Sequence, residues 1–420
     1  MSQAVEPFHV LGTGVPPVDL PPLARRLLES ADLVVGGRRL LEAVPDIPAR
    51  TLPLKPPLES VLNQADQMRR AGNTVVVLAD GDPGFYGIGD RLRREFGPQN
   101  VVVYPNVTVL QAAAARMNRS WERIETVSLH GRSDPTPLLA GLSQGKTVGV
   151  YTDAVNTPAA LGRLLLDRSG DEIVLHVFEN LGGPEERLRS LSPSEAASIE
   201  FSDLNFLLAE RIKPPEVRLR LGLSEAELEH EAGLLTKREI RAAGLSGLQL
   251  ESGQLVWDIG AGCGSVSIEA AALAPGARIV AVEQNERRAG QIRSNVRRTG
   301  ALTVEVLEGR APECLNELPD PDRVFVGGGL GRSEAGLLES ILDRLKPGGR
   351  MVLHLVLLQS LQRALAICRQ RSMDFELQQI QISRAAPLAE DLRLAPLSPV
   401  FILTIQGSRA GKVSPEQSRP

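Results

Sequence analysis

The sequence predicts an α/β protein that folds as two consecutive domains, the second of them Rossmann-like. Its 420 residues exceed the length of one ordinary domain, for which about 150 residues is typical. Short β-branched runs alternate with amphipathic helical periods in both halves, which is the pattern of sheets covered by helices. Between the halves, Lys213-Pro214-Pro215 interrupts regular structure. We therefore expect domains at 1–211 and 236–406, an ordered connector at 212–235, and a disordered polar tail at 407–420.

The individual elements follow from the same patterns. In the first half, the expected strands are the β-branched runs 33–35, 75–79, 101–104, 148–151 and 173–175. Apolar residues recur at helical spacing in 58–70 and 109–117. In the second half we expect strands near Leu255, Arg278, Thr303, Arg323, Met351 and Val400, and helices from Ser265, Glu286, Ser333 and Leu358. The connector contains Ser224-Glu225-Ala226-Glu227, a capping box that starts a short acidic helix.

Composition and charge exclude several classes of protein. The net charge is −4 and aromatic residues make up 3%, so neither a basic stripe nor a base-stacking platform for nucleic acid is expected. No apolar stretch approaches the roughly 20 residues of a membrane helix, and the start lacks the pattern of a secretory signal. Three distant cysteines and five scattered histidines match no disulfide frame or metal-ligand spacing. We expect a cytoplasmic protein without bound metal and without a nucleic-acid or membrane partner.

The most informative motif is a glycine-rich turn in the second half. An apolar run at 255–259 forms a buried strand, Gly260-Ala261-Gly262-Cys263-Gly264 follows it, and a helix begins at Ser265. The spacing G-x-G-x-G, with Ser265 where a dinucleotide-binding helix has its third glycine, favours S-adenosylmethionine over NAD. Glu283 ends the next strand roughly 20 residues beyond the glycines, where a carboxylate can bridge two ribose hydroxyls. The alternative is a plain helix–strand loop with a surface glutamate.

Two loops of the first half also follow strands. Asp80-Gly81-Asp82-Pro83-Gly84-Phe85-Tyr86-Gly87 comes after the run 75–79, and Pro105-Asn106-Val107-Thr108 comes after 101–104. Ligands of open α/β sheets bind at the carboxyl ends of the strands, and loops rich in glycine and aspartate expose polar backbone there. The sequence therefore predicts a second ligand site, unless these loops are only well-made turns.

These motifs resemble two known families, and the resemblance covers nearly the whole chain. The first half resembles the tetrapyrrole methylase family, whose two subdomains hold S-adenosylmethionine, through the loops above and the runs 33–41, 128–132, 179–184 and 201–205. The second half resembles a class I methyltransferase, with Leu235-Thr236-Lys237-Arg238-Glu239-Ile240-Arg241 before its first strand. Fused in this order, the halves resemble the decarboxylating precorrin methyltransferases of cobalamin synthesis.

The resemblance implies a bifunctional enzyme with one S-adenosylmethionine site per domain. Such an enzyme methylates carbons 5 and 15 of precorrin-6Y, or of its cobalt form, and removes the ring C acetate carboxyl to give precorrin-8X. Carbon 5 falls to the first domain, and carbon 15 with the decarboxylation falls to the second. We also expect a homo-oligomer. The alternatives are a methyltransferase of another tetrapyrrole, an RNA or protein methyltransferase in the second half, and a non-catalytic carrier of corrin intermediates that binds S-adenosylmethionine.

The candidate site residues follow in three groups. The predicted cofactor residues of the second domain are Asp258, Gly260, Ala261, Gly262, Gly264, Ser265, Glu283, Gly309, Arg310 and Thr236, with Lys237 beside them. For the first domain the resemblance implies Asp80, Gly81, Asp82, Pro105, Thr108 and Asn205. A precursor rich in carboxylates needs arginine partners and an open loop, for which the candidates are Arg384, Arg393, Arg332, Gly328 and Gly329. No catalytic acid or base is predicted, because methyl transfer mainly requires that donor and acceptor be positioned.

Three places depart from the family pattern. The first loop, Gly12-Thr13-Gly14-Val15-Pro16, lacks its usual last glycine, and its proline is displaced. Asn106 stands where glycine is usual, and we expect it to adopt the left-handed backbone that glycine would have. His354 replaces an asparagine near a strand end. We expect a structural histidine with satisfied hydrogen bonds there.

Overall fold

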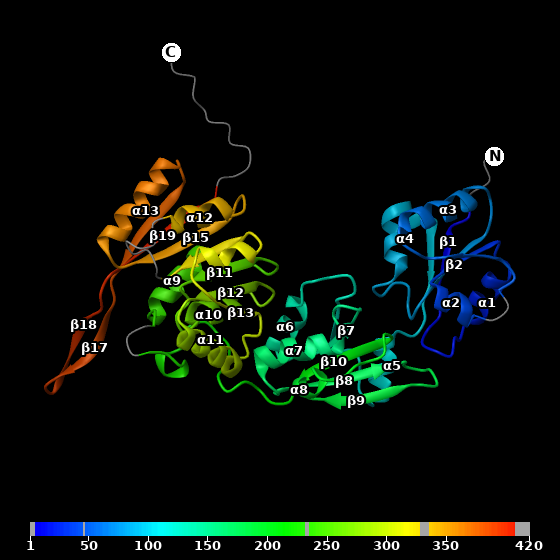
Figure 1. Ribbon diagram of the computed structural model, residues 1–420, viewed down its shortest axis with the longest axis horizontal. Helices are drawn as coiled ribbons and strands as arrows, with labels where there is room; N and C mark the ends of the chain where they lie inside the picture. The colour runs from blue at the N-terminus through cyan, green and yellow to red at the C-terminus, as the bar shows by residue number, and fades with distance from the viewer. Residues whose placement is uncertain (1–4, 45–46, 232–234, 328–335, 408–420) are drawn as a thin grey trace, which may run out of the picture. The chain divides into compact units, whose positions relative to one another are not determined.

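The structure, a computed structural model, describes residues 5–44, 47–231, 235–327 and 336–407. The chain divides into two compact units, of which unit 1 comprises 1–133, 147–163 and 174–210, and unit 2 comprises 134–146, 164–173 and 211–420. Both units combine largely parallel sheets with covering helices (Figure 1). The predicted α/β fold class is thereby confirmed.

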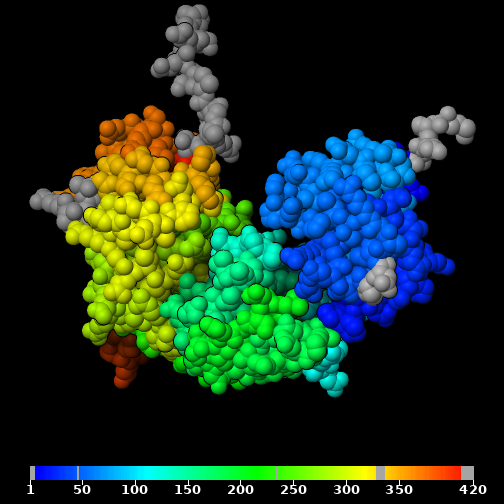
Figure 2. Space-filling model, turned by 45° about the vertical axis from the view of Figure 1, so that its right-hand side comes forward, coloured from blue at the N-terminus to red at the C-terminus, as the bar shows by residue number. Residues whose placement is uncertain are grey.

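Unit 1 begins with a five-stranded parallel sheet in the order β3-β2-β4-β1-β5. Its strands are β1 (Phe8–Gly12), β2 (Leu33–Gly36), β3 (Arg50–Pro53), β4 (Val75–Ala79) and β5 (Val101–Tyr104), with a 3-10 turn η1 (Pro98–Asn100) before the last. Helices α3 (Leu58–Arg70) and α4 (Ile88–Phe96) pack on one face, and α1 (Pro22–Glu29) and α2 (Arg38–Ala43) pack on the other. Figure 2 shows this sheet and its helices as one rounded blue body. Burial on both faces explains why the strands are continuous apolar runs.

A second five-stranded sheet follows, in the order β6-β7-β10-β8-β9. Its strands are β6 (Ile124–Ser128), β7 (Thr147–Tyr151), β8 (Ile173–Glu179), β9 (Arg187–Leu191) and β10 (Asn205–Arg211). Strands β6 and β7 are parallel, whereas β10 is antiparallel to β7 and β9 to β8. Helix α5 (Val109–Arg116) packs on this sheet through Leu110 and Ala113. Helix α8 (Pro193–Ala196) and the first half of α7 (Pro158–Ser169) also belong to unit 1, whereas α6 (Thr136–Ser143) and the second half of α7 belong to unit 2.

Unit 2 contains a seven-stranded sheet in the order β13-β12-β11-β14-β15-β19-β16. Its strands are β11 (Leu255–Ile259), β12 (Arg278–Glu283), β13 (Val304–Glu308), β14 (Arg323–Val326), β15 (Arg350–Leu355), β16 (Phe375–Ile380) and β19 (Val400–Gln406). The first five strands in this order are parallel, and β19 is antiparallel to both of its neighbours. The strand order reverses between β11 and β14. The carboxyl ends of these two strands therefore form the switch point at which ligands of open α/β sheets bind.

Helices cover both faces of this sheet. On one face lie α9 (Arg238–Leu248), α10 (Ser265–Leu273) and α11 (Glu286–Thr299). On the other lie α12 (Leu337–Arg344), α13 (Leu358–Gln370) and the 3-10 turn η3 (Glu313–Glu317). A hairpin of β17 (Ser383–Leu388) and β18 (Asp391–Pro396) forms a separate two-stranded sheet that extends from this body (Figure 1).

Most expected elements of both halves are present. The helix at 58–70 and the strand at 75–79 have the predicted limits, and the acidic connector helix is the 3-10 turn η2 (Glu225–Glu227), which carries the capping box. Strands β16, β17 and β18 were not predicted, because they are largely exposed and lack a buried apolar face. The first residues of the helix expected from Ser333, and all of the predicted tail at 407–420 except Gly407, lie outside the described residues. Among the described residues, no helix combines the length and apolarity needed to span a membrane.

Candidate cofactor and substrate sites

The glycine-rich turn of unit 2 lies at the switch point, between β11 and α10. Gly260, Gly262 and Gly264 have φ values of 69°, 61° and 80°, a left-handed conformation that side chains disfavour. A Cβ atom at Gly264 would also lie 2.8 Å from Ile292 Cγ2, so α11 packs directly on the turn. Backbone shape and packing together therefore set the G-x-G-x-G spacing. The turn leads into the N-terminus of α10, which favours polar and anionic ligand groups.

Two buried carboxylates flank this turn. Glu283 is 4% exposed at the end of β12, where its carboxylate accepts from Gly262 N at 2.9 Å and from Asn285 N at 3.0 Å. Asp258 is 2% exposed on β11, and its Oδ2 accepts from the backbone N of Ser267 at 3.1 Å and from the Ser267 hydroxyl at 2.5 Å. Burial raises the pKa of Asp258 to about 6. Glu283 therefore holds the turn in place, and Asp258 joins β11 to α10.

These residues line a cavity of about 690 Å³ at the carboxyl edge of the sheet. All the predicted cofactor residues of this half except Gly264 line it, namely Asp258, Gly260, Ala261, Gly262, Ser265, Glu283, Gly309, Arg310 and Thr236. Lys237 lines it as well, whereas Gly264 is the residue from which α10 starts. The volume lies within the range of roughly 300–1,000 Å³ that is usual for small-molecule sites. The fold thus brings predicted residues from the ends of β11, β12 and β13, and from the segment that follows the connector, to one cavity.

Unit 1 contains a cavity of its own, of about 790 Å³. The predicted residues Asp80, Gly81, Asp82 and Asn205 line it. Gly81 has a φ of 58° and exchanges backbone hydrogen bonds with Gly14, at 3.1 Å and 3.3 Å, so the first loop and the Asp-Gly-Asp loop are joined. The displaced proline of the first loop, Pro16, also lies in the lining. The first loop, which departs from the family pattern, and the Asp-Gly-Asp loop thus line the same cavity.

The charge of this unit 1 cavity is mainly negative. Its lining includes the carboxylates of Asp80, Asp82, Asp153, Glu200 and Asp203. The guanidinium of Arg39 also lines it and forms an ion pair with Asp80. A lining of this sign favours a cationic ligand, and a sulfonium compound such as S-adenosylmethionine is one.

Pro105 and Thr108 line a neighbouring hollow of about 580 Å³, which shares Asp82 with the cavity. The Thr108 side chain is engaged in a capping box with Gln111 at the start of α5. Asn106 is not among the residues with a positive φ, so the expected left-handed backbone is wrong. Its amide donates instead to Gly12 O and to Asp19 O, each at 2.9 Å. The Asn106 side chain therefore holds the loops together.

Comparison with known proteins covers both halves. Residues 7–197 match the tetrapyrrole (corrin/porphyrin) methylases, and residues 227–406 match the precorrin methyltransferase domain. The chain is 34% identical over 382 residues to a precorrin-6Y C(5,15)-methyltransferase (decarboxylating) from Sinorhizobium sp, with 90% of each chain covered. This chain belongs to the precorrin-6Y C(5,15)-methyltransferase (decarboxylating) family. The predicted resemblance is confirmed, and with it the class of S-adenosylmethionine-dependent methyltransferase.

A second curated relative and one solved structure are also similar to this chain. A precorrin-6Y C(5,15)-methyltransferase (decarboxylating) from Mycobacterium tuberculosis is 32% identical over 90% of this chain and 93% of its own length. A solved structure of precorrin-6Y C5,15-methyltransferase from Geobacter metallireducens is 38% identical, covers 44% of this chain and 98% of its own, and has a TM-score of 0.42.

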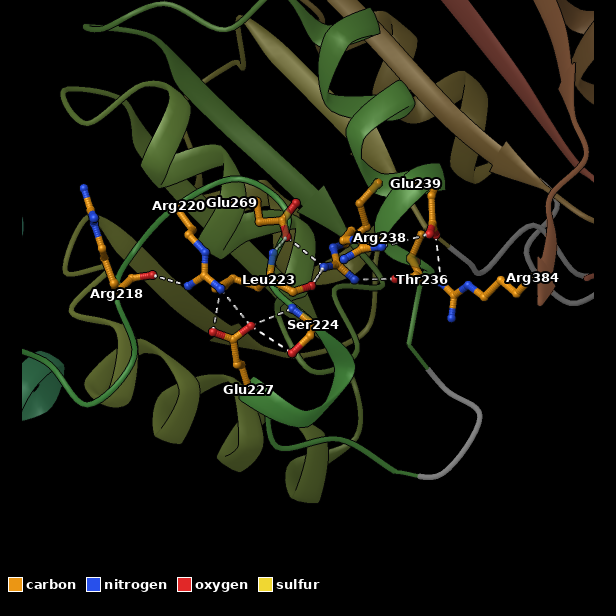
Figure 3. A network of polar contacts seen from close by, with 11 residues as sticks. Arg218, Arg220, Leu223, Ser224, Glu227, Thr236, Arg238, Glu239, Glu269 and Arg384 are labelled. Carbon is orange, nitrogen blue, oxygen red and sulfur yellow. Dashed lines mark hydrogen bonds and ion pairs between the residues drawn. The ribbon is translucent and has the colours of Figure 1, made fainter. Parts of the chain in front are cut away.

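In this member of the precorrin methyltransferase family, a buried ion pair ties the connector to the unit 2 cavity. Arg241 of α9 and Glu269 of α10 have fully buried side chains 2.7 Å apart. Arg241 also donates to Thr236 O at 2.6 Å and to Leu223 O, while Leu223 N donates to Glu269 at 2.8 Å. Figure 3 shows Leu223, Thr236 and Glu269 grouped at this pair. The guanidinium of Arg241 therefore holds the backbone of Thr236 at the cavity. The sequence pattern did not indicate this ion pair.

A second, partly exposed network lies near Lys237. Lys237 Nζ is 2.9 Å from Glu225, and Arg384 of β17 reaches both Glu225 at 3.3 Å and Glu239 at 2.8 Å. Figure 3 shows Arg384 directed at Glu239. The predicted substrate residue Arg384 is thus paired with two carboxylates and lies outside the cavity lining.

The remaining substrate candidates are less informative. Arg393 is exposed on β18 and is not part of the cavity lining. Gly328, Gly329 and Arg332 lie outside the described residues. Gly327, at the start of the same loop, does line the cavity.

His354 on β15 is a lining residue of the unit 2 cavity that sequence reasoning set aside. It is 8% exposed, and neither ring nitrogen has a hydrogen-bond partner among the described residues, so the expected satisfied histidine is wrong. Burial lowers the pKa of His354 to about 4, which leaves the imidazole neutral at pH 7. The only signal in the sequence was the departure from the family's asparagine.

No group of three or more His, Cys, Asp or Glu side chains suited to a metal ion occurs in the described part of the chain.

Proposed function

We propose that this chain methylates carbons 5 and 15 of precorrin-6Y, or of its cobalt form, and decarboxylates the ring C acetate to give precorrin-8X. The first domain, 1–211, acts on carbon 5, and the domain 236–406 acts on carbon 15 and the acetate, with 212–235 as the connector. Each domain binds its own S-adenosylmethionine, and no metal belongs to the protein. The observation that carries this proposal is the presence of a separate cavity in each unit, each lined by loops at strand ends. Relatives whose names describe both methylations span 90% of the chain.

In the second domain, the cavity supports a donor held by backbone. The turn from Gly260 to Gly264 meets the methionine and ribose parts of S-adenosylmethionine, and Glu283 meets the ribose hydroxyls. Gly309 and Arg310, after β13, meet the adenine. Methyl transfer is an in-line displacement, so the protein contributes mainly by holding donor and acceptor at contact distance. No covalent nucleophile is required.

The acceptor brings many carboxylates, for which the unit 2 cavity offers several cations and the mainly negative unit 1 cavity offers Arg39. Lys237, Arg288 and Arg310 line the unit 2 cavity. Arg39 lines the unit 1 cavity, in which it now pairs with Asp80. Guanidinium groups can fork onto carboxylates, so an incoming acetate or propionate can replace the protein carboxylate. Arg384 would act in the same way by exchanging Glu225 and Glu239 for substrate.

The test is anaerobic incubation of the full chain with S-adenosylmethionine and either metal-free or cobalt-containing precursor. Mass spectrometry should find two methyl additions and the loss of one carbon dioxide. A single methyl addition would mean that only one of the two domains has the methylation activity proposed for it. No turnover on either precursor, with S-adenosylmethionine bound but intact, would favour a carrier.

A further inference from the structure

The unit 1 cavity is too small and too acidic to hold both the donor and the whole acceptor of a methyl transfer. Its volume of about 790 Å³ lies in the range of roughly 300–1,000 Å³ that is usual for one small molecule. Five carboxylates line it, and Arg39 is the only lysine or arginine among the described residues of its lining. Because like charges repel, most of the acceptor's acidic side chains must lie elsewhere.

The neighbouring hollow of about 580 Å³ differs from this cavity in charge. Asp82 is the only charged side chain among the described residues that line the hollow. The other lining residues are neutral, namely Gly84, Phe85, Pro105, Asn106, Val107, Thr108, Leu110, Gln111 and Trp121. Such a surface suits the apolar face of a macrocycle, which the acidic cavity does not.

The hollow adjoins the cavity at a short turn. Asp82 and Phe85 line both of them. The turn is held by two hydrogen bonds, since Asp82 Oδ1 accepts from Gly84 N at 2.7 Å and Asp82 O accepts from Phe85 N at 3.1 Å. A donor in the cavity and an acceptor in the hollow therefore approach each other at this turn.

Trp121 gives the hollow a large aromatic surface. The chain has two tryptophans, of which Trp257 is 0% exposed in unit 2 whereas Trp121 is 50% exposed. Trp121 lies in the turn between α5 and β6, where its carbonyl accepts from Ile124 N at 3.1 Å. Val107 lines the same hollow and is 46% exposed. Covering this indole with a flat conjugated ligand removes apolar surface from water and adds aromatic stacking.

The first turn of α5 also borders the hollow. Thr108 is the N-cap of this helix, and Leu110 and Gln111 belong to its first turn. The capping box between Thr108 and Gln111 fixes the start of the helix. Because a helix N-terminus carries a partial positive charge, it suits one of the acceptor's carboxylates beside the stacking surface.

We propose that the methyl acceptor of the first domain binds in this hollow, with one face of its macrocycle against the indole of Trp121. The donor then occupies the acidic cavity, whose charge favours a sulfonium. The proposal rests on the proposed function of the first domain and adds to it the place of the acceptor and its main contact.

The first experiment uses the two tryptophans of the full chain as reporters. Acrylamide, a neutral collisional quencher, should quench the emission of Trp121 in the free protein but not that of Trp257. Metal-free precursor, added anaerobically, should remove most of this quenching, whereas S-adenosylhomocysteine alone should leave it unchanged. The inference fails if Trp121 is not quenched in the free protein, if the precursor gives no protection, or if S-adenosylhomocysteine alone protects.

The second experiment compares the variants Trp121→Ala and Trp121→Phe with a matched control. The control is Leu23→Ala, because Leu23 is 52% exposed on α1 and lies outside the lining of both cavity and hollow. For Trp121→Ala we expect the acceptor KM in carbon 5 methylation to rise roughly 10-fold, as for a lost aromatic contact. Trp121→Phe should show a smaller rise, because it keeps an aromatic ring.

Three further readouts separate a binding role from a structural one. The KM for S-adenosylmethionine, the unfolding temperature and the oligomeric state should stay at the wild-type values in both Trp121 variants. An unchanged acceptor KM in Trp121→Ala, or an equal rise in Leu23→Ala, would overturn the inference. A changed oligomeric state with an unchanged acceptor KM would assign the hollow to a second copy of the chain. Failure of the wild-type chain to methylate carbon 5 would instead overturn the proposed function, whereas the quenching experiment would still test where the precursor binds.

Discussion

The two cavities of this chain differ in where their acidic groups lie. In unit 2, Asp258 and Glu283 are 2% and 4% exposed, and both accept hydrogen bonds from groups of the fold. In unit 1, the side chain of Asp80 is 59% exposed and its partner Arg39 is 48% exposed. A buried carboxylate with protein partners is part of the architecture, whereas an exposed ion pair is screened by solvent and readily exchanged. Substitution should therefore be far more damaging at the unit 2 cavity.

The largest expected effect comes from Asp258→Ala. This change leaves the amide and hydroxyl of Ser267 without their acceptor and loosens the join between β11 and α10. We expect carbon 15 methylation to fall at least about 100-fold, because small displacements of the donor are that costly. Mass spectrometry of the products should still show the carbon 5 methyl. Asp343→Ala is the matched control, since Asp343 is 65% exposed on α12. Retention of both methylations in Asp258→Ala would show that the unit 2 cavity does not depend on this buried carboxylate.

The next largest effect is expected at the buried ion pair between Arg241 of α9 and Glu269 of α10. Arg241→Leu leaves Glu269 as an uncompensated buried charge and removes the donor to Thr236 O. We expect the free energy of unfolding of unit 2 to fall by about 3–5 kcal/mol. Adding Glu269→Leu should recover part of that loss, because the unpaired charge is then gone. Calorimetry of the single and double variants measures both values. A double variant as unstable as the single one would show that the backbone contacts, and not the charge, account for the loss.

A smaller effect is expected at the exposed pair of unit 1. Arg39→Ala should lower the free energy of unfolding by no more than about 1 kcal/mol, as for other exposed ion pairs. If Arg39 meets a substrate carboxylate, the acceptor KM for carbon 5 methylation should rise roughly 10-fold. The neighbouring Arg38, 87% exposed and paired with Glu42, provides the control variant Arg38→Ala. Equal KM values in the two variants would remove Arg39 from the site.

The smallest effects are expected at the hairpin, where substitutions of Arg384 on β17 and Arg393 on β18 should differ in their effect on the acceptor KM. Arg384→Ala breaks two partly exposed ion pairs, so its effect on stability should stay near or below about 1 kcal/mol. We expect its acceptor KM for carbon 15 methylation to rise severalfold, while Arg393→Ala, at an exposed position of β18, leaves KM unchanged. Steady-state kinetics on both variants measures the difference. The reverse ranking would assign the substrate contact to Arg393.

The two cavities also differ in how far sequence alone could find them. The unit 2 site can be predicted from sequence because its backbone requires particular residues. Gly260, Gly262 and Gly264 all have a left-handed φ, and Glu283 follows in the sequence at the spacing that lets it accept from Gly262 N. The unit 1 loops carry no such spacing rule, so their assignment rested on resemblance. Asp80 and Asn205 come from loops far apart in the chain that only the fold brings to one cavity.

What the sequence could not give were the long-range pairs and the exposed strands. Arg241 and Glu269 are both charged residues on helices, and nothing in their spacing indicates that both are fully buried and paired. Strand β16 is largely exposed and has no buried apolar face, although Phe375 and Leu377 alternate with polar residues at its start. The sequence also does not show that the ring nitrogens of His354 lack hydrogen-bond partners among the described residues, because the fold alone brings Phe325 and Gly244 against the ring.

The chain is expected to hold two independent methyl-donor sites. Isothermal titration of the full chain with S-adenosylhomocysteine, the product of the donor, measures it most directly. The wild-type chain should bind two equivalents, and Glu283→Ala should bind one, because only the unit 2 cavity loses the carboxylate that holds its turn. A single equivalent in the wild-type chain, or two equivalents with unchanged affinities in Glu283→Ala, would contradict two independent donor sites of which one depends on Glu283.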